Sequence, residues 1–261
     1  MDEGLDRERR LYAQWADVGG LRVVVTGGGK GLGRAIAGAF HENGCFVALV
    51  GRDRTALDQA RRELGGERVL VHVCDVSDAS ANEMVVTRVV ETWGRLDVWI
   101  ANAGISPVVM DASRLDVEVW RSVMAVNLDG VFFGASAAAR QMSHGGRIII
   151  SGSVLGARPM RGLSAYCAAK AGVIGLAKAM ASELAPEGIL VNVVQPGWFE
   201  SPLTEPWRSS AKLEEQVLGH TSLRRWGRQE ELVGAFLFLA SKSAGYITGS
   251  VLTVDGGYLL A

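Results

Sequence analysis

Short apolar runs rich in β-branched residues alternate along the chain with longer segments of helical period. Runs such as Val-Val-Val at 23–25 and Ile-Ile-Ile at 148–150 are typical of parallel strands that are buried on both faces. The pattern predicts seven strands, at Arg22–Thr26, Phe46–Val50, Val69–Val73, Asp97–Ala101, Arg147–Ser151, Leu190–Gln195 and Val251–Val254. It predicts helices between them, at Gly33–Asn43, Arg54–Leu64, Ala79–Trp93, Val117–Met142, Ala165–Ala185 and Gln229–Ala240.

The strict alternation of strands and helices predicts a single α/β domain. We expect a Rossmann-like, doubly wound parallel sheet of seven strands, with helices on both faces and right-handed crossovers. The domain is predicted over residues 21–261, after an N-terminal extension of residues 1–20 with one amphipathic helix around Leu5–Ala16. An irregular stretch at about 197–227 lies between the sixth strand and the last helix, where such folds place a lid over a ligand.

The composition excludes several classes of protein. Glycine is abundant, with 33 residues among 261, but no Gly-X-Y period runs through the chain, and 48% hydrophobic residues are typical of a globular protein. A net charge of −1 provides no global field to attract nucleic acid or an anionic membrane. We therefore expect a small-molecule substrate as the partner, and neither nucleic acid nor a membrane.

The cysteines and histidines bear on compartment and metal binding. Cys45, Cys74 and Cys167 are odd in number and form no C-x-x-C pair, which suits a reducing compartment. The first residues lack the apolar segment of a signal peptide. The sequence contains no uncharged apolar run of ~18 residues, so no membrane span is expected. The expected localisation is therefore cytoplasmic. No metal site is expected, because the histidines show no paired spacing; they are His41, His72, His144 and His220.

A glycine-rich turn follows the first strand directly and opens the first helix. Bare backbone at such a turn can approach a pyrophosphate, which the helix N-terminus then stabilises. A turn without a ligand is the alternative, whereas a Walker loop is excluded because neither Ser nor Thr follows the lysine. The residues predicted to bind the cofactor here are Gly27, Gly29, Lys30, Gly31, Leu32 and Gly33.

The end of the second strand bears on which nucleotide is bound. A carboxylate there usually holds a ribose 2′-hydroxyl, whereas a 2′-phosphate favours arginine. Here the strand runs into Gly51, Arg52 and Asp53, and Lys30 adds a second cation. This pattern predicts a preference for NADP(H), with NAD(H) left open because Asp53 can reach a hydroxyl or pair with Arg52. The alternative for both cations is a solvated surface position.

Tyr166 and Lys170 are four residues apart at the start of a predicted helix, so their side chains share one face. A phenol with a pKa near ~10 exchanges protons poorly at neutral pH, and we expect the Lys170 ammonium to lower the pKa of Tyr166. Ser153 leaves the preceding strand, where its hydroxyl can hydrogen-bond a substrate oxygen. The spacing alone is also typical of an ordinary helix face, but its combination with the glycine turn and Ser153 favours acid–base chemistry.

Together these motifs show that the sequence resembles the short-chain dehydrogenases/reductases, from about Leu21 to Tyr258. The resemblance implies an NAD(P)-dependent enzyme acting on CH–OH donors, with direct hydride transfer between the nicotinamide and a carbonyl or carbinol carbon. The matching motifs are Thr26-Gly27-x-x-x-Gly31-x-Gly33, Cys74-Asp75-Val76, Ala101-Asn102-Ala103-Gly104, Asn127, Ser153, Tyr166-x-x-x-Lys170 and Pro196-Gly197.

The same resemblance implies roles for individual residues. Tyr166 exchanges the proton and Ser153 orients the carbonyl, so both also contact substrate. Asn127 anchors a proton-relay water near Lys170, which grips the nicotinamide ribose. In the adenosine half, Asp75 and Val76 hold the base, and the sheet beside the ribose is supported by Asn102, Ala103 and Gly104. The residues that flank the nicotinamide are Pro196 and Gly197, followed by Ser201 where the family usually carries threonine.

Stretches at 196–204 and 221–235 resemble gluconate 5-dehydrogenases and related polyol or sugar-acid reductases. The expected substrate is therefore a polyol, a ketose or a keto-sugar acid such as 5-ketogluconate. A carboxylate calls for a cation, and the candidates, each of which also suits a solvated surface, are Arg158, Arg161 and Arg208. Among residues of the irregular stretch, Trp198 is expected in the substrate pocket or in packing, and His220 at the surface or against substrate. Core or interface positions are expected for Trp207 and Trp226.

Two other functions remain open from the sequence. One is a 3-oxoacyl-carrier-protein reductase or a general ketone reductase, and the other is a non-catalytic, regulatory nucleotide-binding protein. The intact set of Asn127, Ser153, Tyr166 and Lys170 argues against the second. Family resemblance also implies a homotetramer, assembled through the helices at 117–142 and 165–185 and the last strand.

Overall fold

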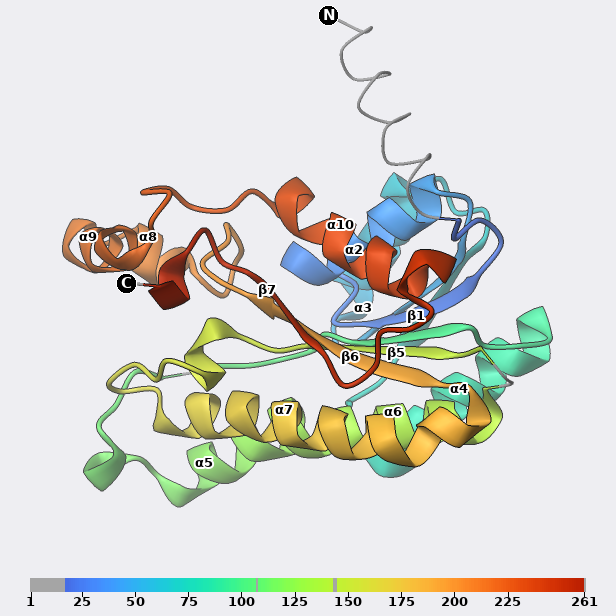
Figure 1. The fold of residues 1–261 in the computed structure, drawn as a ribbon, viewed down its shortest axis with the longest axis horizontal. Helices are drawn as coiled ribbons and strands as arrows, with labels where there is room; N and C mark the ends of the chain where they lie inside the picture. The colour runs from blue at the N-terminus through green and yellow to red at the C-terminus, as the bar shows by residue number, and fades with distance from the viewer. Residues whose placement is uncertain (1–16, 107, 143–144, 261) are drawn as a thin grey trace, which may run out of the picture.

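The computed structural model describes residues 17–106, 108–142 and 145–260. The helix predicted around Leu5–Ala16 and the side chain of His144 lie outside these residues. Seven parallel strands form one sheet between two layers of helices (Figure 1). The predicted fold, a doubly wound α/β domain, is confirmed.

The sheet order is β3-β2-β1-β4-β5-β6-β7, so the strand order reverses between β1 and β4. In register, Val24 of β1 pairs with Ala48 of β2 on one side and with Trp99 of β4 on the other. Because every strand is parallel, all carboxyl ends meet at one edge of the sheet. The strands are β1 (Arg22–Thr26), β2 (Phe46–Gly51), β3 (Val69–Val73), β4 (Val98–Ala101), β5 (Arg147–Ser151), β6 (Leu190–Pro196) and β7 (Val251–Val254).

Helices cover the two faces of the sheet separately (Figure 1). One face packs against α2 (Gly31–Glu42), α3 (Arg54–Glu63) and α10 (Gln229–Ala240). The other face packs against α4 (Ala79–Trp93), α6 (Gly130–Gln141) and α7 (Ser164–Leu184), and α5 (Val117–Met124) lies beside α7. Short 3-10 turns complete the chain, at Ala112–Arg114, Val154–Gly156, Ala185–Glu187, Lys242–Ala244 and Tyr258–Leu260.

Side chains of one strand enter both cores by alternation. Val23 and Val25 of β1 belong to the core under α2 and α10, whereas Val24 belongs to the core under α4 and α6. All three are fully buried, which explains why the strand shows no polar alternation. Val18 is also fully buried in the first core, and its carbonyl accepts a hydrogen bond from the Cys45 thiol, so packing against the domain begins before residue 21.

The helix predicted over Val117–Met142 is continuous as far as Gln141. It contains a π-helical turn at Ala125–Asp129 between α5 and α6, which hydrophobic periodicity does not report. By length and composition, Val117–Gln141 is apolar enough to cross a membrane, but 56% of its most apolar stretch is buried inside the protein. Its small residues, such as Gly134 and Ala138, pack in the core, as in a helix that covers a sheet.

The irregular stretch predicted at 197–227 contains two short helices, α8 (Glu205–Arg208) and α9 (Ala211–His220). Both lie at one end of the molecule, beside the C-terminus (Figure 1). Only Trp207 of α8 and Val217 of α9 are buried, so these helices offer a narrow apolar stripe. That narrow stripe explains why the periodicity of this segment is weak.

Candidate active site

A cavity of about 460 Å³ opens at the carboxyl edge of the sheet, beside the reversal point between β1 and β4. Ligands of open α/β sheets bind at such a point. Many of the predicted residues line this cavity, which brings together side chains from separate loops. They are Gly27, Lys30, Gly31, Leu32, Gly33, Asn102, Ala103, Gly104, Ser153, Tyr166, Lys170, Pro196, Gly197, Trp198 and Ser201.

The glycine turn has the geometry of an anion cradle. Gly27 adopts a φ of +68° and Gly31 a φ of +52°, a region that side chains disfavour. A Cβ on Gly33 would overlap the carbonyl oxygen of Gly27 and lie 2.6 Å from the Asn102 amide nitrogen. The N-cap residue of α2, Lys30, provides no side-chain cap, and its first turn holds no acidic residue. The first amides of α2 are thus suited to an anion such as a pyrophosphate.

Asn102 joins the ends of three strands. Its backbone amide donates to Thr26 Oγ1 at 2.9 Å, and its side-chain amide donates to the Thr26 carbonyl at 3.1 Å. Its amide oxygen accepts from Ser151 Oγ of β5 at 3.1 Å. Thr26 Oγ1 also accepts from the Ala103 amide at 3.0 Å. This network sets the mutual position of the glycine turn and the loop after β4.

Lys170 and Tyr166 lie on one face of α7, as their spacing predicts. The ammonium of Lys170 is 5.8 Å from the centre of the Tyr166 ring and donates to the Ser151 carbonyl at 2.7 Å. Lys170 is buried, and this desolvation lowers its pKa to about 8. The lysine is therefore mostly protonated at neutral pH.

The expected lowering of the Tyr166 pKa by Lys170 is wrong for the protein by itself. Burial raises the pKa of Tyr166 to about 12, and a hydrogen bond with Ser153 opposes that rise only in part. The Lys170 ammonium is 5.8 Å from the ring centre and donates to the Ser151 carbonyl, so its effect on the phenol does not outweigh the desolvation. Tyr166 is thus held in its neutral, proton-donating form.

Ser153 is held from two sides. Its carbonyl accepts from the Gln195 amide at 3.0 Å, and its hydroxyl accepts from the Leu155 amide at 3.2 Å. Gln195 is buried, and its own amide oxygen accepts from Thr253 at 3.0 Å. No signal in the sequence indicated that Gln195 would hold Ser153 or that the Ser151 carbonyl would hold Lys170. Both contacts arise only when strands distant in the sequence pair in the fold.

Asn127 lies behind the cavity and does not line it. It is fully buried in the π-helical turn, where its amide bonds the backbone of Ile105 at 3.1 and 2.8 Å and the Val123 carbonyl at 2.9 Å. A Cβ built on Gly104 would lie 2.7 Å from Asn127 Oδ1 and 3.8 Å from the Lys170 ammonium. Asn127 therefore lies close to Lys170, with the loop after β4 between them.

Five further predicted residues lie outside the cavity lining. Arg52 forms an ion pair with Asp75 at 3.6 Å, and Lys30 forms one with Asp53 at 2.6 Å, so the alternative pairing of Asp53 with Arg52 is wrong. Asp53 also caps α3 by accepting from the Ala56 amide at 3.1 Å. Val76 is buried, and Gly29 faces α3 instead of the cavity.

Aromatic residues of the segment after β6 form one wall of the cavity. Trp198 and Trp207 line it with ring centres 5.6 Å apart, so Trp207 is both a core and a cavity residue. Trp226 packs edge-on to Trp198 at 5.9 Å from behind. Further lining residues that the sequence did not single out are Ser106, Ser151, Gly152, Val154, Leu155, Leu163, Phe199, Pro202, Leu203 and Thr204.

The cations proposed for a substrate carboxylate point elsewhere. Arg161 pairs with Asp111 through two hydrogen bonds of 2.9 and 2.7 Å, and Arg208 pairs with Glu205 at 3.4 Å. Arg158 bonds the Tyr258 carbonyl at 3.0 Å and lies 3.2 Å from His220. In the described part of the chain, these side chains do not line the cavity, and no three His, Cys, Asp or Glu residues group as metal ligands.

The chain is similar to known proteins over nearly its whole length, including the residues of this site. Residues 27–259 match the family described as enoyl-(acyl carrier protein) reductase. The chain is 38% identical over 244 residues to galactitol 2-dehydrogenase (L-tagatose-forming) of Cereibacter sphaeroides, covering 92% of this chain and 95% of the relative. It is 36% identical over 241 residues to a 3-oxoacyl-(acyl-carrier-protein) reductase of Thermotoga maritima, covering 91% and 97%. A short chain dehydrogenase from Burkholderia cenocepacia J2315 in complex with NADP matches with a TM-score of 0.86 at 31% identity, covering 93% and 99%.

Proposed function

Because the chain belongs to the short-chain dehydrogenase/reductase family, we propose that it transfers a hydride between NADP(H) and a carbonyl or secondary alcohol. The observation that carries the proposal is the convergence of Ser153, Tyr166 and Lys170 on the cavity that the glycine turn opens. The uncapped start of α2 and the bare Gly27 and Gly33 fit a dinucleotide pyrophosphate. When bound, the cofactor supplies the hydride, and the protein supplies position and electrostatics.

We assign the proton transfer to Tyr166. Its neutral phenol donates to the substrate oxygen in the reductive direction, and Ser153 orients that oxygen by a second hydrogen bond. The Lys170 ammonium stabilises the tyrosinate that this donation produces, because it is the nearby buried cation. Asn127 supports Lys170 from behind the loop at Gly104, where the family resemblance implies a relay water.

The preference for NADP(H) rests on two cations at the adenosine end of the site. Lys30 and Arg52 are more than half exposed, so their ion pairs with Asp53 and Asp75 are weak and can open toward a 2′-phosphate. Gly51 ends β2 without a carboxylate. The similar Burkholderia cenocepacia dehydrogenase is in complex with NADP, which supports the same choice.

The relatives share carbonyl–alcohol chemistry but differ in substrate. Galactitol is a polyol, which agrees with the polyol, ketose or keto-sugar acid expected from the sequence. The 3-oxoacyl reductase supports a 3-oxoacyl thioester equally well. The polyol or keto-sugar and the 3-oxoacyl thioester are both candidate substrates, and either would react at Ser153, Tyr166 and Lys170. A non-catalytic protein would have no need of the complete set at Ser153, Tyr166 and Lys170.

We also propose a cytoplasmic homotetramer. Cys45, Cys74 and Cys167 are free and buried, which suits a reducing compartment. Apolar side chains remain exposed on the helices that the resemblance assigns to assembly, namely Trp120 on α5 and Phe132 on α6.

The proposed function is tested by NADPH oxidation against carbonyl substrates of several classes, with NADH in parallel. We expect turnover, with a kcat/KM for NADPH at least about tenfold above that for NADH, since one lost charge contact corresponds to about 1.4 kcal/mol. Tyr166→Phe should lower kcat by about a thousandfold, within the range of an acid–base catalyst, and should leave NADPH binding intact. Full activity of Tyr166→Phe contradicts the mechanism, and equal use of NADH contradicts the cofactor preference.

A further inference from the structure

The cavity has two ends of different chemistry. The end at the glycine turn is bare backbone, as described above. The end beyond Tyr166 is lined by large apolar side chains from three separate segments, the turn after β5, the start of α7 and the segment after β6. They are Val154, Leu155, Leu163, Trp198, Leu203 and Trp207.

Among the described residues, no cation lines this apolar end to bind a carboxylate or phosphate. Among the described residues that line the cavity, Lys30 and Lys170 carry the charge. Lys30 pairs with Asp53 beside the glycine turn, and the Lys170 ammonium donates to the Ser151 carbonyl. An acidic group buried there without a partner would incur a large desolvation cost. A sugar acid therefore fits this end poorly.

Hydroxyl groups are also too few to hold a polyol. Thr204 lines the cavity, but its hydroxyl donates to the Phe199 carbonyl at 2.6 Å and accepts from the Ser201 amide at 3.1 Å. Ser201 Oγ lies 3.2 Å from the Thr204 hydroxyl, and the carbonyl itself would use Ser153 and Tyr166. Ser106 and the unpartnered indole N–H of Trp198 add two further polar groups to the described lining. These side-chain groups are fewer than the hydroxyls of a ketose such as fructose, so several of those hydroxyls would lose their water partners without replacement.

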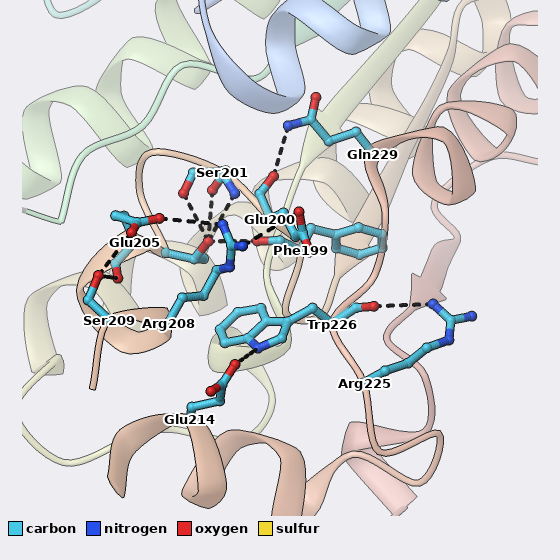
Figure 2. A network of polar contacts seen from close by, with 11 residues as sticks. Phe199, Glu200, Ser201, Glu205, Arg208, Ser209, Glu214, Arg225, Trp226 and Gln229 are labelled. Carbon is cyan, nitrogen blue, oxygen red and sulfur yellow. Dashed lines mark hydrogen bonds and ion pairs between the residues drawn. The ribbon is translucent and has the colours of Figure 1, made fainter. Parts of the chain in front are cut away.

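The aromatic wall is held in place from behind. Trp226 packs against Trp198, and its indole N–H donates to Glu214 on α9 at 2.9 Å (Figure 2). Tyr258 adds a second edge-on contact to Trp198 at 6.2 Å. Trp198 and Trp207 are both more than 90% buried. The apolar wall is thus preformed and does not depend on substrate for its packing.

We propose that the substrate is an uncharged alicyclic ketone, or the matching secondary alcohol, whose remaining atoms are hydrocarbon. The inference rests on the proposed function and narrows it. In reduction, the carbonyl carbon accepts the hydride and the oxygen accepts the Tyr166 proton, so NADPH becomes NADP⁺ and the ketone becomes an alcohol. The hydrocarbon ring packs against Trp198, Trp207 and Leu155, where burial of apolar surface provides the affinity.

The first test compares kcat/KM for 4-methylcyclohexanone and 2-decalone with that for 5-ketogluconate, fructose and an acetoacetyl thioester. We expect the two alicyclic ketones to exceed the others by about a hundredfold, since each buried methylene contributes severalfold to affinity. An equal or higher kcat/KM for a sugar, sugar acid or thioester overturns the inference. Turnover of those substrates that Tyr166→Phe abolishes would leave the proposed function intact.

The second test measures binding without turnover. Calorimetry with 2-decalone and the enzyme–NADP⁺ complex should show binding that weakens about tenfold in Trp207→Ala, with NADP⁺ affinity unchanged. Phe238→Ala is the matched control, because Phe238 lies on α10, outside the cavity lining, and is 38% exposed. Binding of 2-decalone without oxidation of NADPH by any carbonyl would contradict the proposed function and support the apolar site. No binding of 2-decalone overturns the inference.

Discussion

Gly33 illustrates how a single missing side chain shapes the candidate cofactor site. The position it occupies on α2 brings it against both the Gly27 carbonyl and the Asn102 amide, where no Cβ fits. Asn102 hydrogen-bonds Thr26 and Ser151, so a displaced Asn102 would also disturb the ends of β1, β4 and β5. The same helix also carries Gly38, whose added Cβ would meet only Leu64, at 3.8 Å.

Gly33→Ala should weaken NADPH binding by about tenfold or more, since local backbone strain of about 1–3 kcal/mol must be accommodated at the turn. Fluorescence titration with NADPH measures the effect. Gly38→Ala is the control on the same helix, and we expect unchanged binding and slightly higher thermal stability from helix propensity. Unchanged NADPH affinity in Gly33→Ala would show that the turn does not carry the cofactor.

At the scale of elements, the segment from β6 to α10 controls one wall of the cavity. Its inner turn is tied by Thr204, and α9 is tied by the hydrogen bond from Trp226 to Glu214 (Figure 2). Glu214 is half-buried on the inner face of α9, whereas its neighbour Glu215 is exposed. The hydrogen bond from Trp226 to Glu214 therefore connects α9 to Trp198 in the cavity wall.

Glu214→Ala leaves the buried indole N–H of Trp226 without its acceptor, at a cost of about 1–3 kcal/mol. We expect the KM for the carbonyl substrate to rise about fivefold or more, while the affinity for NADPH stays the same. Steady-state kinetics and an NADPH titration separate the two effects. Glu215→Ala should behave like the unmodified protein; an equal rise in KM in both variants would contradict the link from α9 to the wall.

For the whole molecule, the apolar side chains left exposed on α5 and α6 bear on assembly. Trp120 is 39% exposed and Phe132 is 47% exposed, on the layer of helices that covers one face of the sheet. Exposed aromatic side chains on adjacent helices are typical of protein interfaces. The proposed tetramer would remove them from water.

Light scattering should give a mass four times that of the 27.8 kDa chain. Phe132→Asp should shift that mass toward smaller species, because it would bury an unpaired charge in the proposed interface. Met84→Asp is the control, since Met84 is 65% exposed on α4, outside the helices assigned to assembly. A monomer mass for the unmodified protein would refute the tetramer.

Much of the fold could be predicted from local pattern. The β-branched runs indicated both that β1 and β5 are strands and that both of their faces are buried, because a parallel sheet between two helical layers leaves no polar face. The glycine turn and the spacing of Tyr166 and Lys170 are local as well, so geometry along one helix or one turn sufficed to predict them.

Other features depend on segments that meet only after folding. The burial that raises the pKa of Tyr166, and the Ser151 carbonyl that holds Lys170, come from chain far away in the sequence. The pairing of Lys30 with Asp53, and the place of Trp207 in the cavity wall, likewise follow from how loops approach one another. The amino-acid sequence by itself determined the layers, the glycine turn and the candidate catalytic side chains, because each is encoded within a few residues. Only the tertiary structure decided the electrostatics of those side chains and the apolar character of the cavity, because both depend on which surfaces face each other.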